Sequence, residues 1–108
     1  MISPDLPIAV LMAHAAEAAE ALKLLANEQR LMVLCRLSQG ESSVGELVAL
    51  TELSQSSVSQ HLARLREGDM VTTRREGTTI YYRLADARVG ALIDALCDSF
   101  GPRPAANN

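Results

Sequence analysis

The fold is decided by residues 53–65, which read LSQSSVSQHLARL. Ser54 is a residue type that accepts a hydrogen bond from the first turn of a helix, and from Val58 onward apolar residues recur at i, i+4 and i+7. Leu53, just before this cap, and Val58 have the spacing of a hydrophobic staple. The stretch therefore predicts a short amphipathic helix that begins after Ser54 and ends at Gly68.

The outward face of this predicted helix carries short or bidentate hydrogen-bonding side chains, and no carboxylate precedes Glu67. Side chains of this kind contact base edges in the DNA major groove, and a helix N-terminus favours phosphate contact. The predicted DNA-binding residues of the helix are Gln55, Ser56, Ser57, Ser59, Gln60, His61 and Arg64. A merely solvated helix face favours Glu and Lys, so we interpret this one as DNA-reading. For His61 a second interpretation stays open, in which it is a hydrogen-bonded helix residue that contacts no base.

The segments on either side complete a DNA-binding motif. Upstream, Ser43 and Glu46 form a capping box that opens a short helix, and a tight turn joins it to the helix after Ser54. Downstream, β-branched and aromatic residues at 71–75 and 78–84 predict a hairpin that turns at Glu76-Gly77. Two short capped helices followed at once by a hairpin are typical of a winged helix-turn-helix.

Two basic residues of the hairpin are predicted to contact DNA. Arg74 and Arg75 flank its tip, where they would reach neighbouring phosphates or the minor groove.

The rest of the chain predicts helices. Residues 8–25 form an Ala-rich periodic stretch, a second helix runs from Asn27 to Gly40, and a last one is capped by Asp86. The predicted fold is thus mainly α with a β-hairpin wing, in the order ααααββα. We expect one domain at residues 1–101 and a flexible tail at 102–108.

Charge is distributed unevenly along the 108 residues, whose net charge is −3. Residues 1–52 hold three basic and seven acidic residues, a net charge of −4. Residues 84–108 hold two basic and three acidic residues, a net charge of −1. Residues 53–83 hold five basic and three acidic residues, a net charge of +2, so the basic residues gather where DNA would bind. No apolar run is long enough to span a membrane and no signal peptide is evident, so we expect a cytoplasmic protein with no membrane partner.

These motifs resemble those of the ArsR family of repressors. Residues 53–65 are similar to its recognition-helix signature, residues 24–31 (LLANEQRL) to the opening of its second helix, and residues 77–84 to its wing. The resemblance covers nearly the whole chain in order. It implies a homodimer formed through the first and last helices, which binds palindromic double-stranded operator DNA and is released by an inducer.

Many ArsR-family members sense metals, but the ligands for the usual sites are missing. One family site uses cysteines before the recognition helix, and residues 43–47 contain none. The other uses Asp and His of the last helix, which here has no His. His14 and His61 are far apart in sequence, and a zinc or nickel site needs several nitrogen or sulfur ligands. We therefore predict no metal site and no cofactor.

Cys35 and Cys97 are the chain's two cysteines, and each follows an apolar residue by four positions. Such cysteines are commonly small buried hydrophobic residues without chemistry. The pair also resembles that of the sulfide-responsive branch of the family, the BigR- and SqrR-like repressors and the related HlyU-type regulators. That resemblance implies a sensor dithiol, which reactive sulfur species oxidise to a disulfide or polysulfide bridge so that DNA is released. A direct disulfide needs Cα atoms within about 7 Å, whereas a polysulfide spans more.

Three other functions are weighed against this one. A thiol oxidoreductase is disfavoured because the chain has no Cys-x-x-Cys motif and no phosphate-binding glycine loop, so we expect no enzyme activity. An ArsR-type repressor that responds to a metal or another small molecule, with inert cysteines, stays open. A winged-helix domain that only associates with other proteins is the last alternative.

Overall fold

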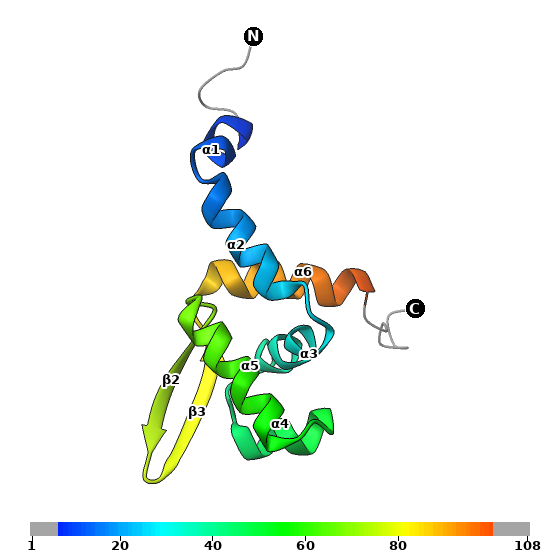
Figure 1. Ribbon diagram of the computed structural model, residues 1–108, viewed down its shortest axis with the longest axis vertical. Coiled ribbons are helices and arrows are strands. Elements are labelled where there is room, and N and C mark those ends of the chain that lie inside the picture. The colour runs from blue at the N-terminus through cyan, green and yellow to red at the C-terminus, as the bar shows by residue number, and fades with distance from the viewer. Residues whose placement is uncertain (1–6, 101–108) are drawn as a thin grey trace.

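The computed structural model describes residues 7–100, so the predicted tail at 102–108 lies outside the described residues. Its helices and strands follow one another in the order α1 (Pro7–Ala13), α2 (Ala15–Leu25), α3 (Glu28–Leu37), β1 (Ser42–Ser43), α4 (Val44–Thr51), α5 (Gln55–Glu67), β2 (Val71–Glu76), β3 (Thr79–Leu84) and α6 (Ala87–Phe100). Figure 1 shows α3, α4 and α5 as a helical body with the β2–β3 hairpin beside it. The predicted class, mainly helical with a hairpin wing, is confirmed.

Two details of the predicted order were wrong. Residues 8–25 form two helices, because His14 leaves helical geometry at φ −124° and ψ 20° and its N–H donates to the Leu11 carbonyl at 3.0 Å. No Pro or Gly marks this break, and Ala-rich periodicity continues across it. The strand β1 was also not predicted, since two residues are too short to show a period.

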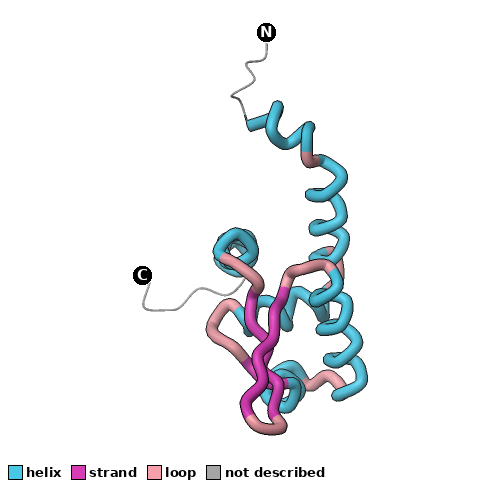
Figure 2. The backbone as a smooth tube through the Cα atoms, turned by 90° about the vertical axis from the view of Figure 1, so that its left-hand side faces the viewer, coloured by secondary structure: helices cyan, strands magenta, loops and turns pink. Residues whose placement is uncertain are grey.

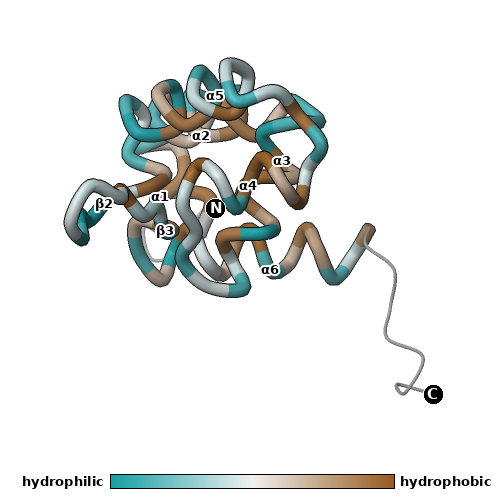
Figure 3. Tube along the Cα trace, turned by 90° about the horizontal axis from the view of Figure 1, so that it is seen from below, coloured by the Kyte–Doolittle hydropathy of each residue, from teal (hydrophilic) through white to brown (hydrophobic). Residues whose placement is uncertain are grey.

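The core is aliphatic and α3 lies at its centre. This helix packs against α2, α4, α5, α6 and β3. The buried side chains are Leu25, Val33, Leu34, Leu37, Leu47, Val58, Leu62, Leu65, Met70, Val71 and Ile93. Figure 3 shows hydrophobic residues gathered in the middle of the helical body, with hydrophilic residues of α5 along its outer edge.

A three-stranded antiparallel sheet of order β1-β3-β2 builds the wing. Its register pairs Val71 with Leu84 and Glu76 with Thr79, and the turn between the strands has Gly77 at φ 64°, where a glycine avoids the Cβ clash. Strand β1 pairs with β3 through Ser42 opposite Tyr82. The start of the helix-turn-helix is therefore hydrogen-bonded to the wing.

The N-terminal helices project from the body. Figure 2 shows α1 and the first part of α2 extending beyond the rest of the domain as an arm. Among residues 7–100, none of the helices has the length and apolar character that crossing a bilayer requires.

Candidate nucleic-acid interface and thiol pair

Local hydrogen bonds set the geometry of the helix pair as the sequence predicts. The Glu46 N–H donates to Ser43 Oγ at 3.2 Å, and the Ser43 N–H donates to Glu46 Oε1 at 2.9 Å, which completes the capping box. Helix α4 ends at Glu52, whose φ of 61° and ψ of 17° are left-handed. Ser54 then caps α5 by accepting the Ser57 N–H at 3.0 Å. These caps fix where each helix begins and hence which side chains of α5 face solvent.

Most of the predicted reading residues lie on the solvent-exposed face of α5. Val58, Leu62 and Leu65 are fully buried and hold the opposite face against the core. The exposed residues are Gln55, Ser56, Ser59, Gln60 and Arg64. Ser57 is half-buried, and its hydroxyl accepts a hydrogen bond from the Ser54 hydroxyl at 3.1 Å.

His61 turns toward α3 instead of lying on this exposed face. Its Nε2 lies 2.7 Å from Gln29 Oε1, so Nε2 carries the proton and donates to that carbonyl oxygen. Burial, followed by the charges of Arg30 and Arg64, lowers the pKa of His61 from its usual 6.5, which keeps the ring neutral. This contact matches the interpretation that His61 is hydrogen-bonded within the protein. Gln29 was missed because nothing in the sequence pairs residues that are 32 positions apart.

The two wing arginines have different surroundings. Arg74 pairs with Glu41 and Glu76 and lies 4.7 Å over the ring of Tyr81. The hydrogen bond from Arg74 is the largest cause of a lowered pKa of Glu41, and both carboxylates raise the pKa of Arg74. Arg75 is exposed, and its side chain has no hydrogen bond or ion pair within residues 7–100. Glu41 was missed as a partner of Arg74 because it lies 33 positions earlier and no local pattern links the two residues.

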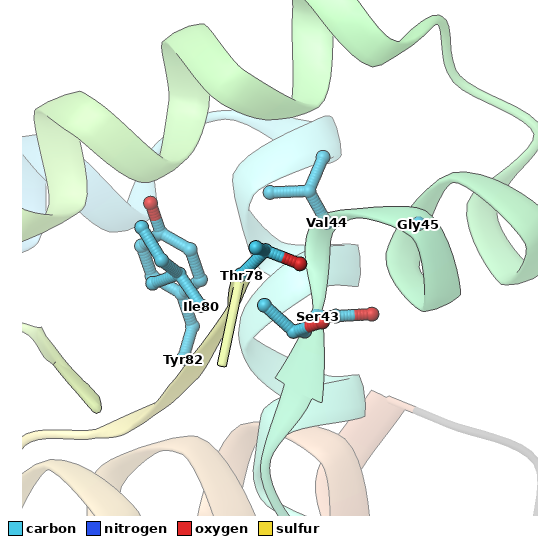
Figure 4. A pocket seen from close by; sticks show the side chains of 7 residues that line it. Ser43, Val44, Gly45, Thr78, Ile80 and Tyr82 are labelled. Carbon is cyan, nitrogen blue, oxygen red and sulfur yellow. The ribbon is translucent and has the colours of Figure 1, made fainter. Parts of the chain in front are cut away.

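A shallow hollow of about 410 Å³ separates the outer half of the wing from the start of α4. Figure 4 shows Ile80 and Tyr82 of β3 on one side of it and Ser43 and Val44 on the other. The residues that line it are Ser43, Val44, Gly45, Thr78, Thr79, Ile80 and Tyr82. The wing tip thus lacks close packing against α4 on this face.

Cys35 of α3 and Cys97 of α6 are joined by a disulfide within one chain. Their Cα atoms are 6.4 Å apart, inside the usual range for a direct bond, so the span requires no extra sulfur. Both residues are half-buried and pack against the core. The pair therefore ties the central helix to the last one. Within residues 7–100, no three His, Cys, Asp or Glu side chains group closely enough to hold a metal ion.

Comparison with known proteins identifies the family. Residues 27–73 match the family described as bacterial regulatory protein, arsR family. The chain is 49% identical over 83 residues to the transcriptional activator HlyU of Vibrio cholerae, a match that covers 77% of each protein. It is 47% identical to the biofilm growth-associated repressor of Agrobacterium fabrum, over 85% of this chain and 79% of that protein.

The fold is likewise shared with solved structures. HlyU from Vibrio cholerae in its reduced form superposes with a TM-score of 0.80 at 44% identity, covering 85% of this chain and 97% of that one. The chain therefore belongs to the ArsR family of bacterial regulatory proteins, and it is a DNA-binding transcriptional regulator with a winged helix-turn-helix fold.

Proposed function

We propose that this protein is a dimeric, non-enzymatic repressor that releases operator DNA when reactive sulfur species oxidise Cys35 and Cys97. The observation that carries the proposal is the 6.4 Å separation of the two Cα atoms, which lets the thiols bridge within one chain. Among its relatives, the Agrobacterium protein is named a repressor, and HlyU has been solved in a form described as reduced. The Agrobacterium name supports the repressor role, whereas HlyU is named an activator and its description supports only a regulator with distinct redox states.

The proposed chemistry uses a persulfide or polysulfide as the oxidant. One cysteine thiolate attacks the terminal sulfane sulfur and becomes a persulfide, while the remainder of the oxidant leaves as a thiolate. The second cysteine thiolate then attacks the sulfur bonded to the first Cβ, which closes the Cys35–Cys97 bond and expels hydrosulfide. Both thiol protons pass to solvent, and the two electrons leave on the hydrosulfide. If the first cysteine carries a longer sulfur chain, attack on the sulfur next to the terminal one expels hydrosulfide and retains the remaining sulfur as a polysulfide bridge.

The proposed dimer is supported by apolar side chains that a single chain leaves exposed. Met12 of α1 is 69% exposed, Leu22 of α2 is 56% exposed and Phe100 of α6 is 84% exposed. A groove of about 1230 Å³, lined in part by Leu11 and Leu92, runs between these helices. Exposed apolar surface of this extent marks an association site. Sedimentation equilibrium is expected to give a dimer at micromolar concentration, and a monomer there would contradict this part of the proposal.

The thiol switch is tested by DNA affinity before and after oxidation. The probe is a fluorescent duplex that the reduced protein selects from a random-sequence pool, and the oxidant is sodium tetrasulfide. Treated wild-type protein is expected to lose at least about tenfold in affinity, about 1.4 kcal/mol, and to regain it with dithiothreitol. Cys35→Ser and Cys97→Ser are expected to bind as well as reduced wild type whether treated or not. Ser99→Ala, an exposed change on α6, is the matched control and should respond like wild type.

Intact mass identifies the product of the same treatment. Loss of both thiol hydrogens indicates a direct disulfide, and added sulfur mass indicates a polysulfide bridge. A wild-type protein whose affinity is unchanged, or serine variants that respond as wild type does, would overturn the proposal and leave Cys35 and Cys97 as core residues.

A further inference from the structure

The wing arginines lie on opposite faces of the hairpin because side chains alternate along a strand. The register places Arg74 opposite Tyr81 and Arg75 opposite Ile80. Ile80 lines the hollow beside α4, so Arg75 shares the face that looks toward the helix-turn-helix (Figure 4). Arg74 therefore lies on the outer face, and its side chain points away from the face that carries Arg75.

The guanidinium of Arg74 is already occupied on that outer face. Its Nε donates to both carboxylate oxygens of Glu41, at 2.8 and 3.0 Å, and its terminal nitrogens contact Glu41 and Glu76, the latter at 2.9 Å. The ring of Tyr81 covers one side of the guanidinium plane. The two carboxylates offset the charges of Arg74 and of Arg83, which also lowers the pKa of Glu41, so this cluster has no net positive charge and attracts a phosphate less than a lone arginine does.

Carboxylates take three of the five N–H donors of Arg74, so a DNA phosphate could take over the forked contact at Nε only by displacing Glu41. Such bidentate pairs are among the stronger side-chain hydrogen bonds. The lowered pKa of Glu41 keeps its carboxylate charged at neutral pH, which preserves the pair. Exchange of Glu41 for a phosphate thus replaces one strong contact by another and adds little affinity.

The contact with Glu41 has a clear geometric consequence. Glu41 immediately precedes β1, and β1 leads directly into α4. The Arg74–Glu41 pair therefore fastens the wing to the start of the helix-turn-helix from the outer face. On the inner face the hollow leaves the wing tip without close packing against α4.

We propose that Arg74 is a positioning residue, which holds the wing in a fixed orientation relative to α5 through its contact with Glu41. We also propose that Arg75 supplies the wing's phosphate contact. The proposal rests on DNA binding and is independent of the thiol switch. It assigns different roles to two adjacent residues of the same type. Surface ion pairs add little to global stability, so the Arg74 role concerns the wing's pose and not the fold.

The test measures operator affinity against salt concentration with the reduced full-length protein and the selected duplex. Arg75→Gln removes a phosphate contact, so the slope of log affinity against log salt is expected to fall by about one per protomer. Arg74→Gln is expected to keep the wild-type slope while affinity falls about 3- to 10-fold at every salt concentration. Glu41→Gln should have the same effect as Arg74→Gln, because it removes the same fastening.

Amide hydrogen exchange supplies a second readout. Arg74→Gln and Glu41→Gln are expected to speed exchange in β2 and β3 and leave α5 unchanged, whereas Arg75→Gln should change neither.

Whether Glu41→Gln raises or lowers DNA affinity distinguishes a positioning role of Arg74 from a phosphate contact. If Arg74 contacts phosphate and Glu41 merely holds it back, Glu41→Gln raises affinity and steepens the salt slope. That result, or a reduced slope for Arg74→Gln, would overturn the proposal. An Arg75→Gln slope equal to that of wild type would also overturn it.

Discussion

Reduction of the Cys35–Cys97 disulfide is expected to lower stability by an amount that the chain topology sets. The two residues are 62 positions apart, so the bridge closes more than half of the chain into one loop. Closing a loop of this length removes about 4 kcal/mol of chain entropy, as free energy at 25 °C, from the unfolded state. Measured stabilisation is commonly smaller because the native state resists part of the constraint. We therefore expect the oxidised protein to be about 2–4 kcal/mol more stable than the reduced one.

Urea unfolding with and without dithiothreitol measures this difference at fixed protein concentration. With a slope of about 1.5 kcal/mol/M, the midpoint is expected to fall by roughly 1.3–2.7 M on reduction. The slope itself should rise, because the reduced unfolded chain is less compact. In Cys35→Ser the reductant should leave the midpoint in place. A shift below about 0.5 M in wild type, or a more stable reduced form, would refute the reasoning, since the bridge would then oppose the native positions of α3 and α6.

Three further changes are expected to alter the urea midpoint or its pH dependence. Glu52→Gly should stabilise the protein by about 0.5–1 kcal/mol, because the left-handed backbone at φ 61° disfavours a Cβ by more than glycine's added unfolded-state entropy. Ser54→Ala should destabilise it by about 1 kcal/mol through loss of the α5 cap, and no change there would contradict the observed Ser54–Ser57 bond. His61 binds its proton more weakly when folded, so its contribution to stability is complete above pH 6.5 and is lost as pH falls through the lower folded pKa. His61→Gln should remove this loss, and a wild-type midpoint that rises on acidification from pH 7 would contradict the assigned sign.

Local signals were enough to predict the helix-turn-helix and the wing. The caps at Asn27, Ser43 and Ser54 depend on side chains within three residues of the groups they bind, so the sequence displays both partners. The faces of β3 follow from alternation, which places Tyr82 against the core. These features need no knowledge of the tertiary structure.

Contacts between distant segments could not be predicted in the same way. The partners of His61 and Arg74 are Gln29 and Glu41, which lie more than 30 positions earlier and have no local pattern. Both arginine and histidine are ordinary DNA-binding residue types, so the sequence alone assigns His61 and Arg74 to the DNA-binding surface. Their roles depend on which helix or strand packs beside them, and only the fold determines that.

The placement of the two cysteines also decides which helix moves under the proposed switch. Three side chains of α3 are buried in the core, whereas α6 contributes Ile93 alone. At about 1.5–3 kcal/mol for each buried aliphatic side chain, displacing α3 costs roughly 5–9 kcal/mol and displacing α6 roughly 2–3. We therefore expect the proposed switch to move α6 relative to the rest of the domain and to leave α3 and α5 in place.

Because α6 is a predicted dimer helix, its shift would alter the spacing of the two recognition helices rather than either reading surface. Oxidation is then expected to weaken binding to the palindromic duplex at least about tenfold, while affinity for a duplex with one half-site stays nearly constant. Fluorescence anisotropy on the two duplexes measures both, with Cys97→Ser as the unresponsive control. Equal losses on both duplexes would place the change within α3 and α5 and refute the ranking of the two displacement costs.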